Sequence, residues 1–212
     1  MDFIIKFLFA LIFITKGFFF IAQNPCSFDY KKNSNLFQEA NDSSSYIFLK
    51  KEPLNFLHCL SINKQKNHLQ ELKAYYFLGM VNYEKLKNYD SSIYYSDKAI
   101  ALFKYFKSKN TEIEFKKFSN KVYKLKFNSI DKKSYESTFR KYNDLENLLN
   151  QLYEVKLDLD EIEFSTRIFD KFSVQSRKYI KELIEKKDTL RAEKILDIFL
   201  NDFAKRYFKN IK

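Results

Sequence analysis

Few residues in this chain have the types and spacing that support catalysis or metal binding. The 212 residues include two cysteines, Cys26 and Cys59, and two histidines, His58 and His68. His58 directly adjoins Cys59, and the four positions match no known zinc-ligand spacing. No HExxH motif is present, and no serine, histidine and aspartate arrangement has support in the sequence. The sequence therefore predicts no metal site, no cofactor and no enzymatic activity.

An acidic run at residues 158–163, DLDEIE, is a second candidate cation site. It lacks the glycine that a calcium-binding loop needs for its sharp turn. Carboxylates are favourable near the N-terminus of a helix, where the helix dipole is positive. We therefore interpret this run as the beginning of a helix.

Composition excludes several classes of nucleotide-binding and hydrolytic enzyme. The chain has only two glycines and two prolines. Phosphate-binding loops, dinucleotide-binding turns and nucleophile elbows each need several glycines within a short loop. Apolar residues make up 45% of the chain and charged residues 31%, which is enough apolar material for a buried core. These properties predict an all-α protein.

The charge balance is basic, with a formal net charge of +11. Arginine supplies only five of the 38 basic residues, although bidentate recognition of phosphates and bases favours arginine. We therefore predict no nucleic-acid partner and interpret the lysines as a solvated surface. A weak attraction to anionic membranes or acidic partners stays open as an alternative.

The N-terminal residues 1–23 have the pattern of a targeting segment. Residues 7–15 form an apolar stretch after a short basic region, and its length suits a secretory signal peptide better than a full membrane span. Cleavage is expected after Ala22 or Gln23, and the chain is then exported to the periplasm or envelope. An uncleaved membrane anchor is the alternative.

Export makes a disulfide between Cys26 and Cys59 a reasonable hypothesis. The bond would tie the mature N-terminus to the second helix and stabilise the fold by about 3–4 kcal/mol through the unfolded state. The alternative is that Cys59 is a buried apolar residue and Cys26 a free thiol.

Helical periodicity begins after residue 33. We expect one helix over residues 34–50, capped by Ser34, and a short one over 53–61, with Pro53 in its first turn. Their apolar positions are Leu36, Phe37, Ala40, Ile47 and Phe48 in the first helix and Leu54, Leu57 and Leu60 in the second.

The stretch from residue 69 to 102 predicts a helical hairpin. Its apolar residues recur at helical spacing, and Asn88-Tyr89-Asp90 interrupts the pattern, so two antiparallel helices are expected. Gly79 lies in mid-helix, where glycine costs about 1 kcal/mol relative to alanine. We infer that it permits close approach of the second helix, on which Ser92 and Ala99 are small.

This hairpin resembles a tetratricopeptide repeat. The residues that match the motif are Tyr75, Leu78, Gly79, Tyr83, Tyr89, Ser92, Tyr95 and Ala99. Tyr83 and Tyr95 each lie one residue from the usual position, one extra residue lies between the helices, and no proline follows Leu102. Because one repeat cannot bury its own face, the resemblance implies neighbouring repeats and a short α-solenoid of hairpins over residues 34–108.

The resemblance also implies a binding groove lined by the first helix of each repeat. In this sequence the groove positions are Lys73, Tyr76, Met80, Tyr83 and Glu84. Such a set suits an acidic or C-terminal peptide segment of a partner protein. The alternative is that Tyr76 and Tyr83 pack against a neighbouring repeat.

Residues 109–212 predict a further helical region that packs on the repeats. A capping box at residues 111–114 begins one helix. Three more patterns cover residues 131–156, 162–184 and 189–208, and the last two form a hairpin. Tyr135, Phe139, Tyr142, Leu145, Leu149 and Leu152 form a nearly heptad seam, which we expect to be intramolecular core rather than a dimer interface.

Taken together, these patterns predict an exported, non-catalytic scaffold that binds another protein or peptide in the cell envelope. The alternative is a membrane-anchored peripheral protein whose lysine-rich surface contacts anionic lipid.

Overall fold

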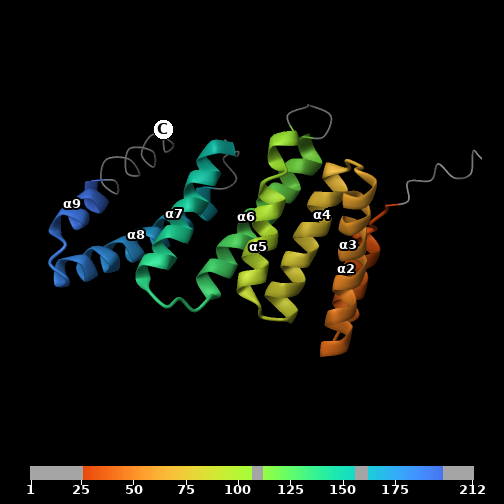
Figure 1. Cartoon of the computed structure of the whole chain (residues 1–212), viewed down its shortest axis with the longest axis horizontal. Helices are drawn as coiled ribbons and strands as arrows, with labels where there is room; N and C mark the ends of the chain where they lie inside the picture. The colour runs from red at the N-terminus through yellow and green to blue at the C-terminus, as the bar shows by residue number, and fades with distance from the viewer. Residues whose placement is uncertain (1–25, 107–111, 156–161, 198–212) are drawn as a thin grey trace, which may run out of the picture. The chain divides into compact units, whose positions relative to one another are not determined.

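A computed structural model describes residues 26–106, 112–155 and 162–197, and every regular element within these ranges is helical (Figure 1). The all-α prediction is therefore confirmed. The α-helices are α2 (Tyr30–Glu39), α3 (Ser43–Asn63), α4 (His68–Met80), α5 (Tyr89–Ile100), α6 (Glu112–Lys132), α7 (Thr138–Val155), α8 (Ile162–Glu185) and α9 (Thr189–Asp197). A π-helical turn, Val81–Lys85, extends α4, and a short 3₁₀ helix, Phe103–Tyr105, follows α5.

The chain divides into two compact units, Met1–Ala74 and Tyr75–Lys212. The predicted signal peptide, residues 1–23, lies outside the described residues. The predicted division into repeats over 34–108 and a C-terminal region over 109–212 stays a prediction.

In the first unit, α2 and α3 pack against each other as a hairpin. Asp29 caps α2 by accepting a hydrogen bond from the Lys32 amide, and Asp42 caps α3 by accepting one from the Ser45 amide. Lys64, in the left-handed conformation, ends α3. The core contains Phe37, Leu49, Leu60 and the stacked rings of Phe28 and Phe56, whose centroids lie 5.8 Å apart.

The helix boundaries predicted for this unit were wrong. The break lies at residues 40–42 rather than after residue 50, and α2 begins at Tyr30, four residues before Ser34. Pro53 lies in the interior of α3, where its buried ring is tolerated despite the lost amide donor. Ile47 and Phe48, predicted to be core, are 69% and 65% exposed.

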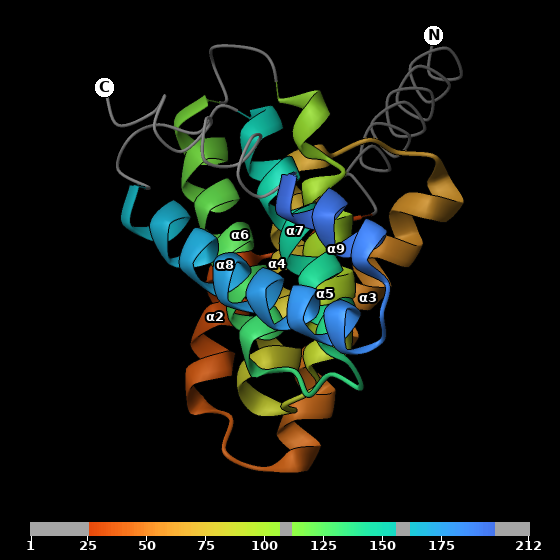
Figure 2. The same cartoon turned by 90° about the vertical axis from the view of Figure 1, so that its left-hand side faces the viewer.

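In the second unit, the extensive helix contacts join neighbours in the sequence: α5 with α6, α6 with α7, α7 with α8, and α8 with α9. The hairpin of α8 and α9 closes on the turn at residues 186–188 (Figure 2). There Lys187 adopts a positive φ, and the Asp188 carboxylate accepts a hydrogen bond from the Arg191 amide. Packing of each helix mainly on its neighbours is the arrangement that helical repeats use.

Most of the seam predicted over residues 135–152 is core within the chain, although Tyr135 and Phe139 are only half-buried. Tyr142, Leu145, Leu149 and Leu152 are buried, and the Tyr142 ring packs against Phe172 of α8 with a centroid distance of 5.0 Å. The predicted start of this helix at residue 131 was wrong, because α6 continues to Lys132 and α7 begins only at Thr138. The Ser137 hydroxyl, which accepts a hydrogen bond from the Arg140 amide, marks the new start.

Candidate functional site

The hairpin of α4 and α5 is held together by small residues. A Cβ atom at Gly79 would lie 2.9 Å from Leu125 Cδ2 and 3.5 Å from the Ser92 carbonyl oxygen. Gly79 therefore permits close approach not only to α5, as predicted, but also to α6. Ser92 and Ala99 are fully buried on α5, and the Ser129 hydroxyl of α6 donates to Ser92 Oγ at 2.8 Å. This packing gives the candidate binding face a rigid support.

Aromatic pairs lie at the positions that resemble the tetratricopeptide motif. The rings of Tyr75 and Tyr95 stack with centroids 6.5 Å apart, and Tyr83 packs against Tyr89 at 5.7 Å. Both contacts join the α4 segment to α5. They supply a physical reason for aromatic residues at these positions, because each ring covers the opposite helix of the hairpin.

A π-helical turn accounts for the extra residue that the sequence showed in this hairpin. A π turn bonds residue i to i+5, so it holds one residue more than an α turn. In Val81–Lys85 the Leu86 amide donates to the Val81 carbonyl at 3.1 Å. The buried Asn82 amide group donates to the Leu78 carbonyl at 2.7 Å. The turn rotates Tyr83 and Glu84 relative to their places in an uninterrupted α-helix.

The structure places four of the five predicted groove residues on one segment of the second unit. Tyr76, Met80 and Tyr83 are half-buried, and Glu84 is exposed. Tyr76 packs edge-on against Phe118 of α6, with a centroid distance of 5.8 Å. Lys73 belongs to the first unit, where it is half-buried.

These contacts bear on the alternative interpretation of the two tyrosines. Tyr76 packs on α6 and Tyr83 on Tyr89, so both rings contribute to the fold. Neither is fully buried, so part of each side chain stays accessible. Burial, together with the neighbouring Tyr89, Glu84 and Asp131, raises the pKa of Tyr83. Like an ordinary tyrosine, it is protonated near neutral pH and can donate a hydrogen bond.

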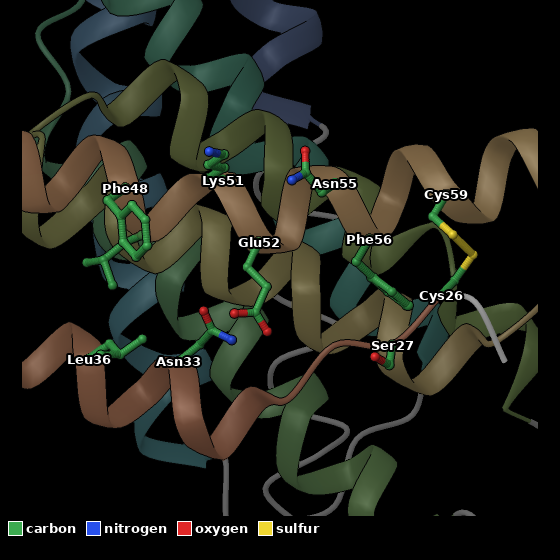
Figure 3. Close-up of a pocket in the computed structure, with 11 residues that line it drawn as sticks. Cys26, Ser27, Asn33, Leu36, Phe48, Lys51, Glu52, Asn55, Phe56 and Cys59 are labelled. Carbon is green, nitrogen blue, oxygen red and sulfur yellow. A yellow bond between two sulfur atoms is a disulfide. The ribbon is translucent and has the colours of Figure 1, made fainter. Parts of the chain in front are cut away.

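The hollows between the helices are lined by residues other than the five predicted groove positions. The first, of about 510 Å³, lies between α2 and α3 in the first unit (Figure 3). Leu36, Phe48 and Phe56 form apolar parts of its wall, and Glu52 points towards Asn33 across it. Glu52 also forms an ion pair with Lys32 at 3.3 Å.

The disulfide lies at one end of this hollow. Cys26 and Cys59 are bonded, with their Cα atoms 5.5 Å apart (Figure 3). The bond joins the segment before α2 to the last turns of α3, as the disulfide hypothesis required. The Asn63 amide group lies 3.5 Å from the sulfur of Cys26 and 3.4 Å from that of Cys59.

A polar hollow of about 550 Å³ lies among α5, α6 and α7. Its most unusual member is Lys126, which is only 4% exposed. The ammonium group lies 2.6 Å from an Asp97 oxygen and donates to the Gln151 amide oxygen at 2.9 Å. The pairing explains why this charge is tolerated in the interior, since an unpaired buried ammonium would be strongly unfavourable. Lys126 thereby links three consecutive helices.

A basic hollow of about 370 Å³ lies among α6, α7 and α8. Its lining residues are Phe127, Lys141, Arg167, Asp170, Lys171, Val174, Gln175 and Lys178. The α8 residues of this lining have helical spacing in the sequence. Phe127 and Lys141 come from α6 and α7, and only the folded structure shows that they line the same hollow.

The polar residues considered for metal chemistry are dispersed. Within residues 26–106, 112–155 and 162–197, no group of three or more histidine, cysteine or acidic side chains is arranged to hold a metal ion. His58 is exposed, and His68 lies 3.5 Å from Glu71. Most of the acidic run at 158–163 lies outside the described residues. No helix in the described part of the chain has the length and apolar character needed to cross a membrane.

Comparison with known proteins yields no relative for this chain. No family model, no curated protein and no solved structure matches it.

Proposed function

We propose that this chain is an exported, non-catalytic scaffold that holds a segment of a partner protein against the α4 face, formed by Tyr76, Met80, Tyr83 and Glu84. The observation that carries the proposal is the partial exposure of three large side chains on a segment whose opposite side is packed without free space at Gly79. The resemblance of this hairpin to a tetratricopeptide repeat supports the same surface.

The chemistry of the α4 face suits an adaptable, largely apolar contact. Methionine is flexible and polarisable, and tyrosine combines an apolar ring with a polar tip. Tyrosine is enriched among the few central residues that supply most of the binding energy in protein complexes, and methionine is enriched at interfaces. The protonated Tyr83 phenol would donate to a peptide carbonyl. The nearby Glu84 and Asp131 disfavour a densely acidic segment at this point, in contrast to the acidic segment that the groove positions suggested in the sequence.

Site-specific photocrosslinking in the cells that make the protein tests this proposal. A benzoylphenylalanine residue is placed at Met80 or Glu84, and in a control protein at Lys187, which is exposed in the α8–α9 turn. We expect a discrete adduct of defined mass from the two α4-face positions and none from Lys187. Equal adducts from all three positions, or none from any, would contradict the proposal.

Export is the second part of the proposal, and it depends on residues 1–23. Mass spectrometry of the protein from its native cells measures the mature N-terminus. We expect it to begin at Gln23 or Asn24. A retained Met1 would instead favour the membrane-anchored alternative.

A further inference from the structure

The basic hollow among α6, α7 and α8 has a regular charge pattern along one helix. Arg167, Lys171, Val174 and Lys178 line it from α8, and their spacing of four, three and four residues places them on one face of that helix. The stripe from Arg167 to Lys178 is about 16 Å long, the length of about five residues of extended peptide.

The cations in this hollow outnumber the carboxylates that can neutralise them. Lys141 and Lys171 share one carboxylate, that of Asp131, at 3.6 and 3.2 Å. Within the part of the chain that the structure describes, Arg167 and Lys178 have no ion pair. Asp170 is the one acidic residue in the lining. Four cations therefore face two carboxylates, and the surplus is located at the two ends of the stripe.

The hollow also has an apolar component, which bears on the kind of partner. The Arg167 guanidinium lies over the Phe127 ring, with 6.0 Å between its carbon and the ring centroid. This cation–π contact holds the guanidinium beside an apolar ring. Val174 is 42% exposed midway between Lys171 and Lys178. The surface thus has unpaired cations at both ends, and between them lie the Lys171 ammonium, paired with Asp131, and the exposed apolar side chain of Val174.

We propose that this basic hollow binds an acidic, extended peptide segment that carries an apolar side chain between its carboxylates. A segment of about five residues matches the stripe in length, and its charge complements the unpaired Arg167 and Lys178. A flat anionic membrane would not need a hollow of defined length that exposes an apolar side chain. The inference rests on the proposed scaffold function but uses a surface distinct from the α4 face.

The test measures binding of the purified full chain to a fluorescein-labelled peptide with a central leucine flanked by glutamates and aspartates. The basic-hollow variant carries Arg167→Glu and Lys178→Glu. The matched control carries Lys124→Glu and Lys194→Glu, two exposed lysines outside the hollow, so the net charge changes equally. We expect the dissociation constant of the peptide to rise about tenfold in the basic-hollow variant and less than twofold in the control variant.

Further arms keep the result interpretable. A variant with Arg167→Gln and Lys178→Gln removes charge without reversing it, and a thermal melt by circular dichroism reports the fold of every variant. A charge-inverted peptide and vesicles with or without phosphatidylglycerol replace the acidic peptide in parallel titrations. We expect no binding of the inverted peptide and no dependence of vesicle binding on Arg167 or Lys178.

Three results would overturn the inference. The first is no binding of the acidic peptide, and the second is equal weakening of peptide binding in the basic-hollow and control variants. The third is binding through Arg167 and Lys178 to anionic vesicles but not to the peptide. None of these results bears on the proposal for the α4 face. The crosslinks from Met80 and Glu84 are measured in proteins whose basic-hollow residues are unchanged. Failure of the scaffold proposal and failure of this inference are therefore distinguishable.

Discussion

Gly79 determines how closely α4 can approach its neighbours. A leucine there would place a whole side chain where a single Cβ already meets Leu125 at 2.9 Å. We expect Gly79→Leu to lower the free energy of unfolding by about 3 kcal/mol through overpacking. Chemical denaturation of parent and variant measures the difference.

Gly79→Ala is the informative control for that variant. Its methyl group meets the mobile end of Leu125, and alanine gains about 1 kcal/mol of helix propensity over glycine. We therefore expect a change of less than about 1 kcal/mol in either direction. A leucine variant as stable as the alanine variant would remove close approach as the reason for this glycine.

Tyr142 has a buried hydroxyl group that lacks a hydrogen-bond partner within the described part of the chain. The residue is 1% exposed. Tyr142→Phe keeps the ring contacts with Phe172 and Tyr179 and removes an unsatisfied group. We expect the free energy of unfolding to rise by about 1 kcal/mol.

The matched substitution is Tyr123→Phe. The Tyr123 hydroxyl donates to the Gln151 carbonyl at 3.3 Å, so its removal leaves that contact unmade. We expect the free energy of unfolding to fall by about 1 kcal/mol. Denaturation curves that shift in the same direction for both variants would contradict this account of the two hydroxyls.

At the scale of helices, the disulfide is the strongest constraint on the first unit. It closes a loop with a sequence separation of 33 residues. Reduction, or replacement of both cysteines by serine, should destabilise α2 and α3 by about 3–4 kcal/mol. Hydrogen exchange of the α2 and α3 amides before and after reduction measures this loss. Unchanged protection, or two titratable thiols in the native protein, would contradict it.

Helix identity could be predicted from this sequence, but several boundaries could not. The rule that places proline in a first turn suggested a helix start at Pro53, yet α3 begins ten residues earlier, at the serines that follow the Asp42 cap. The periodicity of aromatic residues also continued through Tyr135, which lies in the connection before α7. The Tyr135 hydroxyl donates a hydrogen bond to the Asp144 carboxylate at 2.7 Å. A residue of the connection therefore contacts α7 as if it belonged to the helix, which is why the spacing alone placed it there.

The residues of the two candidate surfaces could be predicted from the sequence to different extents. The α4 face comes from one continuous segment, so residues such as Tyr76 and Met80 could be named in advance. The basic hollow combines α6, α7 and α8, and its net charge depends on Asp131 being shared by Lys141 and Lys171. Sequence spacing reveals only the α8 part of such a site.

At the scale of the whole molecule, the chain is helical and the helices of its second unit pack mainly on their sequence neighbours. Its buried polar contacts follow the same order, since Lys126 joins α5, α6 and α7 through Asp97 and Gln151. Helices joined in this way present side chains along successive elements, which is how repeat proteins form extended binding surfaces.

The most direct test of the scaffold proposal is the dissociation constant between the purified chain and the partner that the photocrosslinking captures. It is measured by fluorescence anisotropy for the parent and for a variant carrying Met80→Ala and Tyr83→Ala, with the thermal melt as a control on folding. We predict binding at least about tenfold weaker in the variant, because truncation of a central hot-spot side chain such as tyrosine typically costs about 2 kcal/mol or more. An unchanged dissociation constant in a folded variant would contradict the central claim that the α4 face holds the partner.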